Sequence, residues 1–251
     1  RSTLFPYTTL FRSLADKMAK ALALIATDRH RTNLLRKPEQ NAIAYMVQKI
    51  PSWVSSDGLT VFGFFGNIMV AVSFVLGAYI NRYCLLVSLL GFTINWIGDS
   101  LDGRLAYYRN KPRKWHGFSL DLTIDWIGTI LIGIGYTFYA TGWSKYFGFF
   151  FVALYGWEMI TALLRYKISG KYSIDSGVFG PTEVRIILAI IIILEVIFPG
   201  LLNYLAAIAC LILLASNIFE SWLLSRLANK QDKLERHLKE KGEKRKQAQN
   251  D

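Results

Sequence analysis

Several uninterrupted apolar stretches, each close to twenty residues long, restrict the fold of this chain more than any other feature. A helix needs about 20 apolar residues to cross the roughly 30 Å hydrocarbon core of a bilayer. Soluble domains do not carry repeated stretches of this length. The sequence therefore predicts an all-α, polytopic membrane protein. Six transmembrane spans are expected, at about 59–80, 85–100, 117–140, 146–166, 178–198 and 201–224.

The spans and their flanking segments divide the chain into four parts: residues 1–13, an N-terminal segment 14–57, the six-helix membrane domain 58–225 and a basic tail 226–251. Residues 1–13 resemble a translated sequencing adapter and are left out of the fold prediction. The tail is expected to be helical. It either contacts anionic lipid headgroups or forms a solvated helix, and both interpretations stay open.

A further helix is expected at residues 38–50, between two prolines. Its apolar residues recur at helical spacing, at Ile43, Met46, Val47 and Ile50. Such an amphipathic helix either lies in the membrane interface or packs against the cytoplasmic face of the bundle. The two placements do not exclude each other.

Basic residues are distributed unequally between the loops that the spans create. Loops on one side contain Arg104, Arg109, Lys111, Arg113, Lys114, Arg165, Lys167 and Lys171, whereas the other side offers Arg82 and Lys145. Cytoplasmic loops carry the excess of Lys and Arg in membrane proteins. Both termini are therefore expected in the cytoplasm, and the membrane is taken to be a bacterial cytoplasmic membrane. The net charge of +11 does not indicate nucleic-acid binding, because no nucleic-acid module accompanies it.

Four aspartates stand in two pairs near the cytoplasmic ends of the second and third spans: Asp99 with Asp102, and Asp121 with Asp125. Residues three or four apart share one face of a helix, so each pair presents two carboxylates side by side. Four carboxylates at a membrane boundary repel one another unless cations lie between them. A hard divalent cation with oxygen ligands, most simply Mg²⁺, meets this requirement.

The second pair argues against a purely structural explanation. An Asp before a Gly, as at Asp102, is common in turns and caps. Asp121 and Asp125, in contrast, lie inside a long apolar helix, where an ionised carboxylate is costly unless it is paired or bound to a metal. Neighbouring Arg113 and Lys114 can neutralise one such charge but not four. A metal-dependent site is therefore expected.

The same stretch resembles the signature of the CDP-alcohol phosphotransferase family, which is Asp-x-x-Asp-Gly-x-x-Ala-Arg, a short spacer and Gly-x-x-x-Asp-x-x-x-Asp. The matching residues are Asp99, Asp102, Gly103, Ala106, Gly117, Asp121 and Asp125. Tyr107 stands where the family has Arg, and the spacer is slightly longer. Arg104 shares a helical face with Tyr107 and is expected to supply the missing charge to a phosphate, with Arg109 as a second candidate.

The resemblance implies a transferase of phospholipid biosynthesis that moves a substituted phosphate from a CDP-linked donor to an alcohol and releases CMP. In that family three aspartates bind a pair of Mg²⁺ or Mn²⁺ ions, and the fourth is the general base. Carried over, Asp99, Asp102 and Asp121 are metal ligands, whereas Asp125 is the base and also touches a metal. The nucleotide site is then expected to include Gly103, Ala106, Gly117, Arg104 and Arg109.

The resemblance also implies the partners. The donor is most often CDP-diacylglycerol with a polar alcohol as acceptor, and the alternative is a CDP-choline or CDP-ethanolamine type of donor with diacylglycerol as acceptor. A homodimer through the span faces is a further expectation. Lys167, Lys171, Glu183 and Arg185 form a candidate acceptor pocket, although Glu183 and Arg185 equally suit a structural pair.

Two other functions stay open. A cation transporter would use the aspartates as an ion path, but transporter sites usually lie near the midplane between inverted repeats. The aspartate pairs here lie at one face and are not repeated in the second half of the chain. The other function is that of an inactive homologue, which Tyr107 keeps under consideration.

Overall fold

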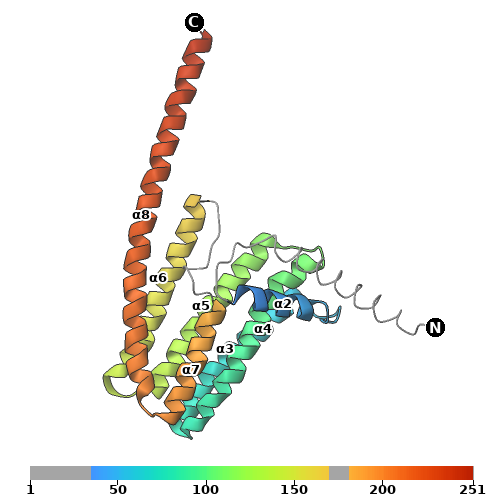
Figure 1. The fold of residues 1–251 in the computed structure, drawn as a ribbon, viewed down its shortest axis with the longest axis vertical. Helices are drawn as coiled ribbons and strands as arrows, with labels where there is room; N and C mark the ends of the chain where they lie inside the picture. The colour runs from blue at the N-terminus through green and yellow to red at the C-terminus, as the bar shows by residue number, and fades with distance from the viewer. Residues whose placement is uncertain (1–34, 170–180, 251) are drawn as a thin grey trace, which may run out of the picture.

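The computed structural model describes residues 35–169 and 181–250, which form helices and no β-strand. The predicted divisions before residue 35, as well as Lys171, lie outside these ranges. The helices are α2 (Arg36–Val47), α3 (Ser56–Tyr79), α4 (Val87–Tyr108), α5 (Lys114–Tyr139), α6 (Tyr146–Ser169), α7 (Pro181–Ile197) and α8 (Leu201–Asn250), with short 3₁₀ helices at Arg82–Leu86 and Gly142–Lys145. The long helices lie side by side, α2 crosses one end, and α8 extends well beyond the others (Figure 1).

Five of the six predicted spans correspond to helices that are long and apolar enough to cross a membrane. The exception is α7, which covers 17 described residues of the predicted span 178–198. At 1.5 Å per residue its length is about 26 Å, which is near the lower limit for a spanning helix. A sixth span therefore stays a prediction. The helix of the second predicted span, α4, continues beyond Ser100 through the charged residues to Tyr108.

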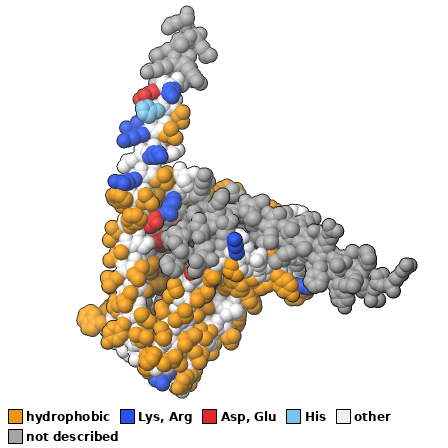
Figure 2. All heavy atoms as spheres, in the orientation of Figure 1, with side chains coloured by type: hydrophobic (Ala, Val, Ile, Leu, Met, Phe, Trp, Pro, Cys, Tyr) orange, Lys and Arg blue, Asp and Glu red, His pale blue; other side chains and the backbone are white. Residues whose placement is uncertain are grey.

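Polar and small side chains lie inside the bundle, beside its apolar clusters. The buried polar residues include Asn67, Ser73, Ser88, Asn95, Thr129, Thr161 and Asn217, whereas large apolar residues such as Phe65, Ile190 and Leu211 are exposed. Apolar side chains cover most of the bundle surface in Figure 2. Lipid tails solvate such a surface without penalty, and helices in lipid associate through close packing and hydrogen bonds. The arrangement is that of an integral membrane protein.

Glycines let α3 and α4 approach each other closely. A Cβ added at Gly66 would lie 2.4 Å from the carbonyl oxygen of Gly91, and one added at Gly98 would lie 2.4 Å from Cα of Gly63. These neighbours are backbone atoms, which cannot turn aside as a flexible side chain can. Small residues of this kind are typical of helix contacts in membranes. The contact also fixes the position of Asp99, the residue after Gly98.

The helix before the first span packs against the end of the bundle. Ile43 and Val47 of α2 are almost completely buried and belong to one apolar cluster with Leu59 of α3 and Leu101 of α4. The helix ends at Val47, three residues before its predicted end at Ile50. Packing on the bundle, one of the two expected placements, is therefore confirmed, and contact with the membrane interface stays a prediction.

Polar contacts join the membrane part of α8 to α6. The Asn217 amide donates to the Leu154 carbonyl at 2.8 Å, and the Trp157 indole donates to the Ser221 hydroxyl at 3.0 Å. Arg165 of α6 and Glu220 of α8 form an ion pair between the same two helices. Beyond these contacts α8 continues as a helix to Asn250, which confirms the helical tail but not its contact with lipid.

Replacing Gly98 with Ala is expected to destabilise the protein by about 1–3 kcal/mol, because the new methyl group overlaps the backbone of α3. Thermal unfolding of the detergent-solubilised protein measures the change. Gly103→Ala is the matched control on the same helix, since a Cβ there meets nothing within 4 Å. Equal unfolding temperatures for the two variants would contradict the close α3–α4 contact.

Candidate active site

The aspartate pairs meet at the end of the bundle where α3 begins, α4 ends and α5 begins. Carboxylate oxygens of Asp99, Asp121 and Asp125 lie within 4.8 Å of one another. Asp121 and Asp125 are one turn apart on α5, and Asp99 faces them from α4. The expectation that the two pairs lie on helices and converge is correct for these three residues.

Asp102 lies beside this trio but is held by α3. Its carboxylate accepts a hydrogen bond from the Thr60 hydroxyl at 2.7 Å and another from the backbone N–H of Gly103. Its backbone carbonyl accepts a bond from the Ser56 hydroxyl at 2.5 Å. All four aspartates nevertheless line one small cavity of about 10 Å³ between α3, α4 and α5.

The donor set fits a divalent metal ion. Three carboxylates converge on a small cavity, whose volume is close to the minimum of about 10–15 Å³ that a single water molecule needs. Hard divalent cations prefer such oxygen ligands, and the negative charges need a compensating cation in surroundings of low polarity. Asp99, Asp121 and Asp125 are the residues that could hold the ion, with Asp102 adjacent.

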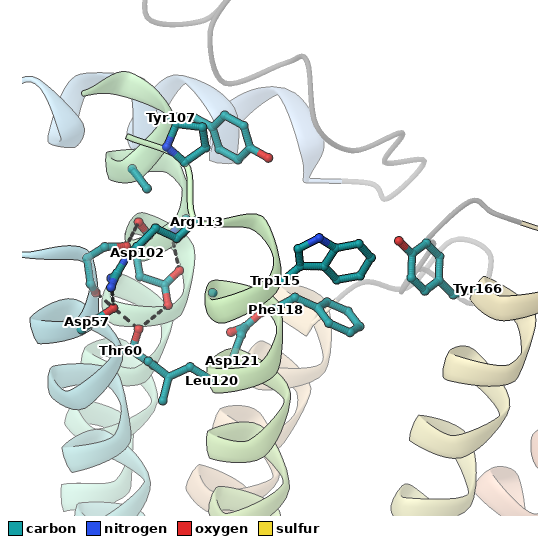
Figure 3. Close-up of a pocket in the computed structure, with 15 residues that line it drawn as sticks. Asp57, Thr60, Asp102, Tyr107, Arg113, Trp115, Phe118, Leu120, Asp121 and Tyr166 are labelled. Carbon is teal, nitrogen blue, oxygen red and sulfur yellow. Dashed lines mark hydrogen bonds and ion pairs between the residues drawn. The ribbon is translucent and has the colours of Figure 1, made fainter. Parts of the chain in front are cut away.

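A larger pocket of about 140 Å³ opens next to the small cavity. Asp102 and Asp121 lie in the walls of both. Trp115, Phe118 and Tyr166 line one side of the larger pocket, and Asp57, Thr60, Asp102 and Arg113 lie opposite (Figure 3). The three small residues of the motif, Gly103, Ala106 and Gly117, also line it. No described atom lies within 4 Å of a Cβ built at either glycine, so the motif backbone is accessible there.

The two arginines predicted for the nucleotide site, Arg104 and Arg109, are not among the residues that line the larger pocket. Arg109 donates to the backbone carbonyls of Pro51 at 2.8 Å and Val54 at 2.5 Å, so its guanidinium joins α4 to the segment after α2. Among the described residues, neither Arg109 nor Arg104 lines the larger pocket. The guanidinium that does so belongs to Arg113, which forms an exposed ion pair with Asp57.

The candidate acceptor residues do not gather in one described pocket. The buried Glu183 carboxylate accepts from the backbone N–H of Leu35 at 2.9 Å, and Lys167 is exposed at the end of α6. Arg185 reaches α4, where its Nη2 donates to Asp99 Oδ2 at 2.5 Å and its Nε donates to Asn95 Oδ1 at 2.8 Å. Glu183 and Arg185 therefore bond to different elements.

A model of the CDP-alcohol phosphatidyltransferase family matches residues 53–218. The chain belongs to this family. The match begins just before α3 and ends inside α8, so it contains both aspartate pairs and the larger pocket. A search of curated protein sequences finds no match to the chain.

Membership in the family indicates which type of reaction this site geometry serves. CDP-alcohol phosphatidyltransferases transfer a phosphate-linked group from a CDP-alcohol to an alcohol acceptor, and they typically use a divalent metal. The resemblance on which the sequence prediction rested is thus confirmed. The metal, nucleotide and acceptor roles of individual residues remain predictions.

Sequence reasoning missed two residues around the aspartates. The Thr60 hydroxyl donates to Asp102, and the Asn95 amide oxygen accepts from Arg185. Polar residues inside apolar spans are a general sign of function, and both stand in such spans. Their partners lie on other helices, however, so no local spacing could identify them.

Replacing Thr60 with Val should lower metal-dependent activity by about 10–100-fold, because residues that orient a metal ligand have effects of this size. Val matches the shape of Thr but cannot donate to Asp102. The dependence of rate on Mg²⁺ concentration measures the effect. Thr60→Ser keeps the hydroxyl, and its metal-dependent activity is expected to stay close to that of the parent. Equal losses of activity in both variants would contradict a role for this hydrogen bond.

Proposed function

We propose that this protein transfers a phosphatidyl group from CDP-diacylglycerol to the hydroxyl of a polar alcohol and releases CMP, as a step of phospholipid synthesis. The observation that supports the proposal best is the convergence of Asp99, Asp121 and Asp125 beside a pocket lined by the small residues of the family motif. The substrates differ in polarity, and a site at the end of a membrane bundle is accessible to both.

In the proposed mechanism Asp125 takes the proton from the acceptor hydroxyl. The hydroxyl oxygen then forms a bond to the phosphorus of the phosphatidyl group, and the bond between that phosphorus and the bridging oxygen breaks, so that CMP leaves with the bonding electrons. A pair of Mg²⁺ or Mn²⁺ ions would stabilise the negative charge on the diphosphate and on the leaving group. Asp99, Asp102 and Asp121 would hold those ions, and Asp125 would also touch one.

We infer that the cytidine nucleotide binds in the larger pocket. Gly103, Ala106 and Gly117 leave the backbone of α4 and α5 open to a ligand, and the neighbouring Trp115 and Phe118 offer aromatic faces to a base. Both features support a nucleotide site, in agreement with the family motif.

Arg113 is the best-placed candidate for the phosphate contact that the family Arg, replaced here by Tyr107, would make. It lines the pocket together with Tyr107, whereas Arg104 and Arg109 do not. Its ion pair with Asp57 is largely exposed, and exposed pairs contribute little, so the guanidinium is able to turn toward a ligand.

Replacing Arg113 with Gln is therefore expected to raise KM for the CDP-linked donor by about tenfold or more, which corresponds to the loss of one charge-assisted hydrogen bond. Arg104→Gln is the matched comparison. The initial rate as a function of donor concentration measures both. A larger increase in KM for Arg104→Gln than for Arg113→Gln would favour Arg104, as predicted from the sequence, as the phosphate contact.

The decisive experiment is CMP release by the purified protein in lipid, with CDP-diacylglycerol, Mg²⁺ or Mn²⁺ and a panel of polar alcohols. Asp125→Asn should lower the rate by about 100-fold or more, since a general base contributes 10²–10⁴-fold. Asp232→Asn, on the part of α8 beyond the bundle, makes the same chemical change away from the site and should leave the rate unchanged.

The outcomes separate the remaining alternatives. CMP formed only from CDP-choline or CDP-ethanolamine with diacylglycerol would reverse the roles of donor and acceptor. Metal-dependent release that survives in Asp125→Asn would remove the general base from the proposal. No CMP with any donor would identify an inactive homologue. The same proposal includes a site that faces the cytoplasm, which the distribution of basic residues supports, and a homodimer, which the resemblance to the family implies. A bacterial membrane stays an expectation.

A further inference from the structure

Arg185 forms the most direct link between α7 and the acidic site. Two nitrogens of its guanidinium donate to residues one turn apart on α4: Nε to Asn95 at 2.8 Å and Nη2 to Asp99 at 2.5 Å. The side chains of Arg185 and Asp99 are only 16% and 23% exposed. An ion pair at this depth is weakly screened, so the attraction between its two charges is larger than at the protein surface.

Asn95 holds the arginine in this position. Its Nδ2 donates to the backbone carbonyl of Gly63 at 3.2 Å, which leaves its Oδ1 pointing toward Arg185. The buried Asn95 side chain thus connects α3 to the guanidinium. A planar guanidinium with its donors in a rigid fork suits such a two-point contact, whereas a lysine ammonium does not.

The charges explain what this contact does. Asp99, Asp121 and Asp125 together carry three negative charges when ionised, and Arg185 supplies one positive charge against one of them. We propose that Arg185 is a built-in counter-ion of the metal site, which neutralises Asp99 in the metal-free protein and weakens divalent-cation binding by competing for that carboxylate. Asn95 is the positioning residue that keeps Arg185 in place.

This inference rests on the proposed metal site but not on the transferase reaction. An arginine that only bound the acceptor would leave metal affinity unchanged in the absence of acceptor. An arginine with only a structural role would change stability without changing metal affinity. A counter-ion changes both, because its removal takes away a stabilising ion pair and also the positive charge that competes with a cation for Asp99.

The test is the binding of Mn²⁺ alone to the purified protein in detergent, followed by the EPR signal of free Mn²⁺, without nucleotide or acceptor. Arg185→Gln is expected to tighten Mn²⁺ binding by at least tenfold. Without metal, the same variant should unfold at a lower temperature than the parent. Added Mn²⁺ should raise the unfolding temperature of the variant by more than that of the parent. Arg185→Lys keeps the charge but loses the two-point contact, so it should tighten Mn²⁺ binding less than Arg185→Gln does.

Two further variants make the test specific. Asn95→Leu releases the guanidinium from its anchor and should tighten Mn²⁺ binding by at least threefold, which also covers the case in which Arg185→Gln does not fold. Arg165→Gln breaks a different ion pair of the same bundle, with Glu220, and should leave Mn²⁺ affinity unchanged.

Unchanged or weaker Mn²⁺ binding in Arg185→Gln, or in Asn95→Leu if the first does not fold, overturns the counter-ion. If neither the parent nor Arg185→Gln binds Mn²⁺, the metal site and the counter-ion are overturned together. CMP release is measured separately, so normal Mn²⁺ binding with no CMP release would count against the proposed reaction and not against Arg185.

Discussion

The cost of ionised carboxylates in surroundings of low polarity governs this structure. Asp99, Asp121 and Asp125 lie on helices whose outer surfaces are apolar, and their oxygens converge within 4.8 Å. These side chains are only partly exposed to solvent, so partners within the protein or bound cations must compensate much of their charge. Arg185 supplies one positive charge, and hydrogen bonds from Thr60 and Gly103 hold the neighbouring Asp102.

The low polarity of the surroundings also determines how the helices are held together. Helices in lipid gain little from burying apolar surface, so close approach and internal hydrogen bonds determine which faces meet. Gly66 and Gly98 bring α3 and α4 together, and Gly98 directly precedes Asp99. At the same end of the bundle, Arg109 fastens the segment after α2 to α4. The rigid contact between α3 and α4 therefore lies immediately beside the acidic site.

Much of the candidate site could be predicted because its signals are local. Apolar length predicts spans, and spacings of three or four residues predict which carboxylates share a helix face. Partners across helices were not predictable in this way: Arg109 was expected to bind nucleotide and instead bonds to Pro51 and Val54. Arg113 lines the pocket, whereas Arg104 was expected there. Such outcomes depend on helix rotation and crossing, which no short sequence window contains.

The sequence by itself determined the all-helical membrane class, the family and the two aspartate pairs, because hydrophobic length and helical spacing are properties of contiguous residues. Only the tertiary structure decided that three aspartates converge while Asp102 bonds to Thr60, and that Arg185 reaches Asp99 from a helix more than eighty residues away. These contacts depend on how α3, α4, α5 and α7 pack. Packing is set by the sum of many contacts between residues far apart in the chain.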